Sequence, residues 1–266
     1  MKDWISLFWS YESEIPVGRG FSHFGMAHLL WLGGLLAVSV LLLRLTAKQG
    51  TSFGDKLARF LGWSLLVMEL YRDLVLTLIG HYGIYELPLH LCSLAGFLCT
   101  LHMLFHREWM EQVLYTLCLP GAMAALLFPD WVAYPAIHFM TIHGFVFHGA
   151  VVLYICLALA RREIVPSLRE LWKPVVFLCV IVPPIYIFNK ILHTNYLFIN
   201  VPSPGSPLVL LEQWFGNPGY LVAYAVVIFL VMVGMDVGYA GWRKIRGCNH
   251  PPLNRERGNH PLFNNH

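Results

Sequence analysis

The chain has 266 residues, of which 57% are hydrophobic and 12% are charged, and this charged share is about half that of soluble domains. The formal net charge of +3 is small and gives no indication of a nucleic-acid partner. The composition excludes an ordinary soluble protein and predicts an all-α bundle that crosses a membrane several times. The length suits one domain of helices of about 20 residues each, and we expect it to occupy residues 1–242.

Residues 1–22 are rich in tryptophan and phenylalanine, which predicts an interfacial segment along the membrane surface. Seven apolar stretches then predict seven spanning helices, at residues 26–45, 58–79, 87–105, 113–128, 132–160, 174–192 and 217–239. The sixth contains Pro183 and Pro184, which should bend or break it unless neighbouring helices satisfy the freed carbonyls. Residues 193–214 read as a loop, and residues 243–266 as a polar, disordered cytoplasmic tail.

The basic residues predict the orientation of the bundle. Arginine and lysine gather in the first, third and fifth connections and after the last span, whereas the even connections hold none apart from Lys190 at a helix edge. By the positive-inside rule the N-terminus lies outside and the C-terminus inside. We therefore expect a multi-pass protein of the cell membrane.

The start of the third stretch places polar chemistry where lipid is expected. Pro88 fits the first turn of a helix, so the helix should begin near Leu87. His90 and Cys92 are two residues apart, so they leave a helix on roughly opposite sides and do not easily pair. Any base for Cys92 must come from another helix.

The second stretch carries three charged residues, Glu69, Arg72 and Asp73, spaced so that they lie within one turn of each other. One charge at the bilayer centre costs about 2.5 to 3.5 kcal/mol on insertion scales. The group should therefore face the bundle interior. One interpretation is a structural ion pair between helices, and the other is an electrostatic frame or lipid-headgroup contact beside a site.

The fifth stretch carries His138, His143 and His148, five residues apart and therefore spread round the helix. At about 1.5 Å per residue, Cys92 lies in depth between His138 and His143. A thiol becomes a nucleophile when a nearby base forms the thiolate, so Cys92 and His143 are a candidate pair. The same residues could instead serve as metal or haem ligands, or each histidine could simply be buried and hydrogen-bonded.

No metal-ligand motif is present, so we expect no metal and no cofactor. The remaining cysteines of the apolar stretches lack a polar setting and are interpreted as packing residues. They are Cys99, Cys118, Cys156 and Cys179.

Several short motifs carry a resemblance to a known family. They are Leu87-Pro88-Leu89-His90-Leu91-Cys92-Ser93, His143-Gly144, Thr194-Asn195-Tyr196-Leu197-Phe198, and Leu210-Leu211-Glu212-Gln213-Trp214-Phe215-Gly216-Asn217-Pro218-Gly219-Tyr220. In this order they resemble the YwaF-like family of bacterial integral membrane proteins, which is similar to the eukaryotic transmembrane protein 164 group. That group is regarded as cysteine-dependent acyltransferases acting on phospholipids. The resemblance implies a nucleophile at Cys92 and a partner at His143, the histidine before the glycine, with His138 and His148 as alternatives.

Two functions are consistent with these residues. The first is a membrane acyltransferase or lipid hydrolase whose Cys92–His143 pair acts on phospholipid acyl chains, with phospholipids or lysophospholipids as partners. The alternative is a seven-helix transporter, or a protein that binds a small ligand or lipid without catalysis. The residues expected to support or bind the substrate are His90, His138, Glu69, Arg72, Asp73, Asn189, Asn195 and Tyr196.

Overall fold

The computed structural model describes residues 4–245, and every regular element in that range is a helix. The α-helices are α1 (Trp4–Phe8), α2 (Met26–Gln49), α3 (Thr51–Leu78), α4 (Leu91–Phe105), α5 (Glu108–Val113), α6 (Leu119–Leu127), α7 (Phe139–Ala160), α8 (Trp172–Leu192), α9 (Leu208–Phe215) and α10 (Tyr220–Ile245). Short elements of other helix types are η1 (Glu12–Glu14), the π-helix η2 (Leu114–Cys118), η3 (Leu168–Glu170) and η4 (Tyr196–Phe198).

Five helical stretches are long and apolar enough to cross a membrane, so the chain is a helical membrane protein. They are Met26–Gln49, Glu108–Leu127, Phe139–Ala160, Leu168–Leu192 and Tyr220–Ile245. Helices α3 and α4, which the sequence predicts to span the membrane, differ from these five. Helix α4 is apolar but shorter, and α3 is long but interrupted by charged residues such as Arg72.

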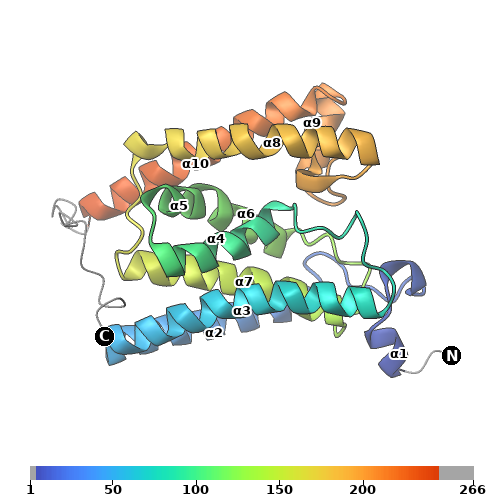
Figure 1. Cartoon of the computed structure of the whole chain (residues 1–266), viewed down its shortest axis with the longest axis horizontal. Coiled ribbons are helices and arrows are strands. Elements are labelled where there is room, and N and C mark those ends of the chain that lie inside the picture. The colour runs from blue at the N-terminus through green and yellow to red at the C-terminus, as the bar shows by residue number, and fades with distance from the viewer. Residues whose placement is uncertain (1–3, 246–266) are drawn as a thin grey trace, which may run out of the picture.

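The long helices lie roughly along the longest axis of the molecule (Figure 1). Helices α2 and α3 lie side by side and pack against α7, while α4, α5 and α6 separate this group from α8 and α10. The core centres on α7, where Val151, Ile155 and Leu157 have no exposed surface. In contrast, α2, α8 and α10 leave large apolar side chains exposed, as expected of helices that face lipid.

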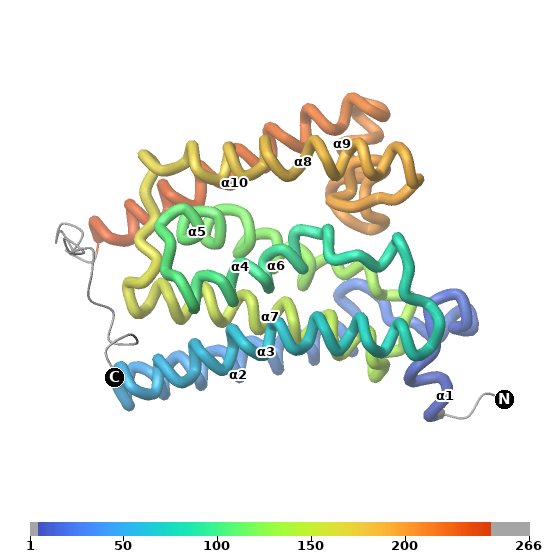
Figure 2. The backbone as a smooth tube through the Cα atoms, in the orientation of Figure 1, coloured from blue at the N-terminus to red at the C-terminus, as the bar shows by residue number. Residues whose placement is uncertain are grey.

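Helices α4 and α7 begin later than the sequence predicts, and both changes concern the end of the bundle where α1 lies. Helix α4 begins at Leu91 rather than at residue 87, because the backbone is still extended at His90 (φ −71°, ψ 151°). Figure 2 shows the segment between α3 and α4 folding back and running inward before α4 starts. Helix α7 begins at Phe139 rather than at residue 132, and Thr141 Oγ1 in its first turn donates to the Pro135 carbonyl of the preceding loop (2.8 Å).

Other boundaries also differ from those predicted. The fourth stretch begins at Glu108, before residue 113, and runs through the π-helix into α6. The expected loop at 193–214 contains η4 and most of α9, and the last long helix begins at Tyr220 rather than at residue 217. Helix α8 continues as one element through Pro183 and Pro184. The expected tail lies outside the described residues from residue 246 onward.

The N-terminal segment packs against the α1 end of the bundle. The Phe8 ring lies 6.1 Å from the His138 ring, and the Trp9 ring lies 5.2 Å from Phe139. Farther along, the Phe21 amide donates to the Val132 carbonyl (3.0 Å). These contacts hold the segment against the start of α7.

Candidate active site

The three charged residues of α3 form one buried ion-pair group centred on Arg72. Its guanidinium lies 3.1 Å from Glu69 Oε1 and 2.8 Å from Asp73 Oδ1. Only 2% of the Glu69 surface is exposed. An ionised carboxylate at such a position is tolerated when a counter-charge compensates it.

Glu69, Arg72 and Asp73, called the Arg72 group below, also contact the segment that leads into α4. Arg72 NH2 donates to the Glu86 carbonyl (2.9 Å), which lies in the segment that leads to α4. Ser93, in the first turn of that helix, lies close to Glu69. All three charged residues lie on α3, so the ion pairs form within one helix, and the group contacts the chain on both sides of Cys92.

Two contacts fix how α4 and α7 lie against each other. A β-carbon on Gly96 would stand 2.6 Å from Cζ of Phe147, so the bare backbone of α4 lies directly on that ring. Farther along both helices, His102 Nδ1 and the Tyr154 hydroxyl are hydrogen-bonded at 2.8 Å. Because residue numbers increase together in the two contacts, α4 and α7 run parallel.

This register brings Cys92 and His143 to one level of the bundle. Each lies four residues before the Gly96–Phe147 contact on its own helix, and residues four apart share a helix face. The His143 ring also stacks on Phe147, with centroids 5.3 Å apart. No hydrogen bond joins Cys92 to His143 in the part of the chain that the structure describes.

The other two histidines of this region have separate surroundings. His138 is the N-cap of α7, and its Nδ1 accepts a hydrogen bond from the Met140 amide (3.1 Å). His148 Nδ1 lies 2.6 Å from the Gly144 carbonyl, and its ring stacks on Trp131 with centroids 5.1 Å apart. Because a carbonyl only accepts, His148 must carry its proton on Nδ1, which leaves Nε2 with a free lone pair.

The three histidines His138, His143 and His148 each have an Nε2 atom that is buried without a hydrogen-bond partner among residues 4–245. An unpaired buried polar atom costs stability, and such exceptions are found at catalytic positions. His148 and Arg72 are both close enough to His143 to act on it electrostatically. This region of the bundle therefore contains a buried thiol and imidazole nitrogens that have no partner in the described residues.

Asp130 is a site neighbour that the sequence did not indicate. It lies in the loop between α6 and α7, and its charge acts on the thiol of Cys92. Asp130 is exposed at the surface, but the surrounding protein restricts the hydration of its carboxylate. This loss of hydration raises the pKa of Asp130, and the nearby carboxyl groups of Glu12 and Glu86 raise it further. A single acid after a proline carries no motif that could have singled it out.

Two predicted supporting residues, one near the end of α8 and one in the loop after it, bind other parts of the protein itself. Asn189 Oδ1 accepts from the Thr194 hydroxyl (2.8 Å) and from the Tyr196 amide (2.9 Å). Asn195 Oδ1 accepts from two backbone amides, those of Asn200 and Val201 (both 3.1 Å). These carboxamides organise the loop rather than point to a ligand.

The same loop reaches the start of α4. The Tyr196 hydroxyl donates to the Ile84 carbonyl (2.6 Å), and its ring lies 5.0 Å from that of His90. Phe198 packs on His90 from another side, at 5.2 Å. His90 and Tyr196 are thus neighbours that help to position the helix carrying Cys92.

Across residues 4–245, no three histidine, cysteine, aspartate or glutamate side chains gather closely enough to hold a metal ion. The chemistry that the arrangement offers is that of a thiol, imidazoles and a buried ion pair.

The sequence profile of the TMEM164 family matches residues 23–236 of the 266-residue chain. The matched range contains the Arg72 group, Cys92, Asp130 and the histidines of α7, and it ends within α10. It leaves out α1 and η1. No curated protein and no solved structure matches the chain. With a match over most of its length, the chain belongs to the TMEM164 family.

Proposed function

We propose that this protein is an integral membrane acyltransferase or lipid hydrolase that uses Cys92 as nucleophile and His143 as base, and that phospholipids are its substrates. The observation that carries the proposal is the parallel register of α4 and α7, in which both residues lie one turn before the Gly96–Phe147 contact. The proposal requires a hydrogen bond between the Cys92 thiol and the His143 imidazole when substrate is bound. In unliganded enzymes, hydrogen bonds between catalytic groups are often long and tighten with substrate.

The proposed reaction has two halves. His143 takes the thiol proton of Cys92, and the thiolate attacks the carbonyl carbon of a phospholipid ester. The ester C–O bond breaks, the histidine proton passes to the leaving oxygen, and a lysophospholipid departs while the acyl group stays on Cys92 as a thioester. A lysolipid hydroxyl or water then gives its proton to His143 and attacks the thioester carbonyl. The C–S bond breaks, the acyl group leaves as a phospholipid or a fatty acid, and the proton passes from His143 to the Cys92 sulfur.

We further propose seven spans in the cell membrane, with the N-terminus outside. Helices α3 and α4 complete the set, and the segment before α4 runs inward to make up for the shortness of that helix. Arg161 pairs with Asp55, near the first connection, and with Glu163, so the first and fifth connections meet at the end of the bundle opposite α1. Cysteine-accessibility mapping tests this topology, since labelling of Arg162→Cys from outside would contradict it.

The experiment that tests the activity uses purified protein in vesicles with a phospholipid labelled in its acyl chain and a lysophospholipid acceptor. Cys92→Ala should abolish transfer, and His143→Ala should lower it by about 10²- to 10⁴-fold, the usual contribution of a general base. The double variant should be no worse than Cys92→Ala, because residues that act as a unit are not additive. An acyl group released by hydroxylamine should be found on the wild-type protein.

Cys99→Ala is the control, because Cys99 lies on the same helix, is fully buried and belongs to the core. It should keep its transfer activity. A Cys92→Ala protein with full lipid activity would contradict the proposal and favour the alternative of a transporter or binding protein.

A further inference from the structure

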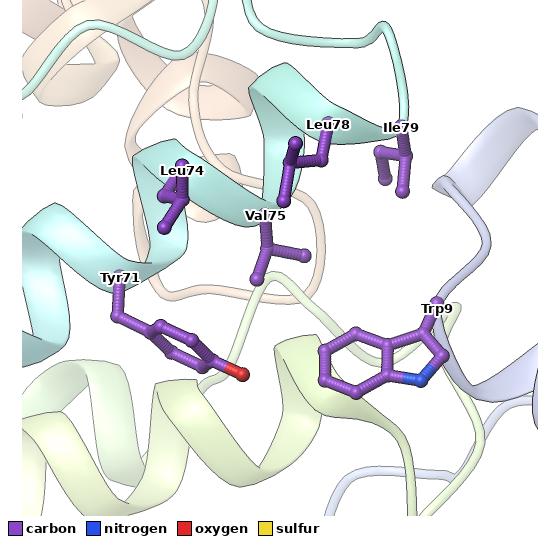
Figure 3. A pocket seen from close by; sticks show the side chains of 6 residues that line it. All are labelled: Trp9, Tyr71, Leu74, Val75, Leu78 and Ile79. Carbon is purple, nitrogen blue, oxygen red and sulfur yellow. The ribbon is translucent and has the colours of Figure 1, made fainter.

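An apolar groove runs along the lipid-facing flank of α3 at the α1 end of the bundle. Its cavity volume is about 230 Å³, and it is lined by Trp9, Tyr71, Leu74, Val75, Leu78 and Ile79. Figure 3 shows the rings of Tyr71 and Trp9 approaching from opposite sides below the aliphatic side chains of α3. Leu74 and Leu78 are more than half exposed, so the groove is open to its surroundings.

One aromatic ring separates this groove from the candidate histidine. Phe139 packs against both ring residues of the groove, with centroid distances of 5.2 Å to Trp9 and 5.8 Å to Tyr71. On its other side the Phe139 ring lies 6.2 Å from that of His143. Phe139 is buried at the start of α7, with the groove residues and His143 as ring neighbours.

The chemistry of the groove fits a hydrocarbon chain. Its lining is aliphatic and aromatic carbon, and the only polar side-chain atoms are the Tyr71 hydroxyl and the Trp9 indole nitrogen. The volume is below that of pockets that enclose a whole small ligand, about 300 to 1,000 Å³, but suits part of a chain. Tyrosine and tryptophan at the end of a spanning helix are typical of the depth where acyl chains begin.

We propose that this groove is the lateral entry site for an acyl chain of the substrate phospholipid, and that Phe139 is the partition past which the ester moves to reach His143 and Cys92. This inference rests on the proposed function. The first methylenes of the chain lie along Leu78, Val75 and Leu74 while the headgroup stays at the membrane surface. The chain then moves inward between α3 and α7.

The test uses the full chain in vesicles containing a phospholipid with a diazirine among the first carbons of one acyl chain. After irradiation, mass spectrometry should find the label on Trp9 and on residues 71–79. Leu74→Trp should lose most of this labelling and should lower the transfer rate, because the indole fills the groove. Leu70→Trp is the matched control, since Leu70 is exposed one turn away on the same helix but does not line the groove.

The outcomes separate this inference from the proposed function. Labelling is measured in Cys92→Ala as well, so it needs no chemistry. Label confined to other helices, or equal labelling of the groove in the two tryptophan variants, would overturn the entry site even if Cys92 proves essential. Conversely, loss of the enzyme hypothesis would leave the labelling result to decide the groove by itself.

Discussion

Gly96 and Phe147 touch so closely that no other residue fits at position 96 without movement: a β-carbon there would lie 2.6 Å from the ring. This contact sets the spacing of α4 and α7 one turn beyond Cys92 and His143. The small residue brings the two helices together, and the ring holds His143 by stacking at 5.3 Å. The contact therefore governs how far apart the proposed nucleophile and base lie.

Gly96→Val should push the two helices apart and reduce transfer by about 100-fold, since a displacement of about 1 Å at a site can cost that much. Overpacking should also lower the free energy of unfolding by about 1–3 kcal/mol. Rates and melting temperatures of the purified variant check both effects. Gly34→Val is the control, because a β-carbon at Gly34 on α2 meets nothing within 4 Å. Wild-type transfer by Gly96→Val would show that the contact does not position the site.

Arg72→Met should destabilise the protein more than either Glu69→Gln or Asp73→Asn. Removing the cation leaves the buried Glu69 without a counter-charge, which costs about 3–5 kcal/mol of unfolding free energy. The Asp73 side chain is 21% exposed, so its loss should cost at most about 1 kcal/mol. Thermal unfolding of the three variants in one detergent gives the ranking. Equal stability of all three would mean that the group is solvated rather than buried.

His138 should prove to be a capping residue rather than the base. Because its Nδ1 accepts from the Met140 amide, His138→Ala should lose about 1 kcal/mol of stability, whereas His138→Asn keeps an acceptor favoured at N-caps. Transfer per folded molecule should be unchanged in both variants and lost in His143→Gln. A folded His138→Asn protein without transfer would reverse the assignment of the two histidines.

The apolar stretches were sufficient to predict the long helices, but not where α4 and α7 begin. Pro88 suits both the first turn of a helix and an extended segment. A tertiary contact decides between the helical and the extended conformation, because Arg72 donates a hydrogen bond to the Glu86 carbonyl and holds the segment out of the helix. Both helices start later than predicted, at Leu91 and Phe139. The two errors have the same sign, so both starting points shift in the same direction along the bundle.

The roles of single polar residues were harder to predict. An asparagine within a spanning helix predicts a partner but not which one, and Asn189 binds the loop that follows its own helix. Asp130 and the contact between Trp131 and Gly144 depend on how a loop folds back onto α7. No periodicity in the sequence encodes that fold, so these residues emerge only from the structure.

Asp130→Asn should stabilise the protein at neutral pH and have little effect in acid. The pKa of Asp130 is raised above its ordinary value of 3.8, mainly by the loss of hydration, so the folded state holds the proton more tightly than the unfolded state. The protonated carboxyl thus favours folding fully below that ordinary value, and the benefit is lost as the pH rises through the raised pKa. At neutral pH the ionised carboxyl opposes folding, and asparagine removes that cost.

Melting temperatures of the wild type and Asp130→Asn, measured from about pH 4 to about pH 7.5, span the transition. The gap between the two proteins should widen as the pH rises. Glu12→Gln provides the control, because the Glu12 carboxylate also raises the pKa of Asp130, and in that background the gap at neutral pH should shrink. A variant that is less stable than the wild type at neutral pH would show instead that the Asp130 carboxylate has a stabilising partner in the folded protein.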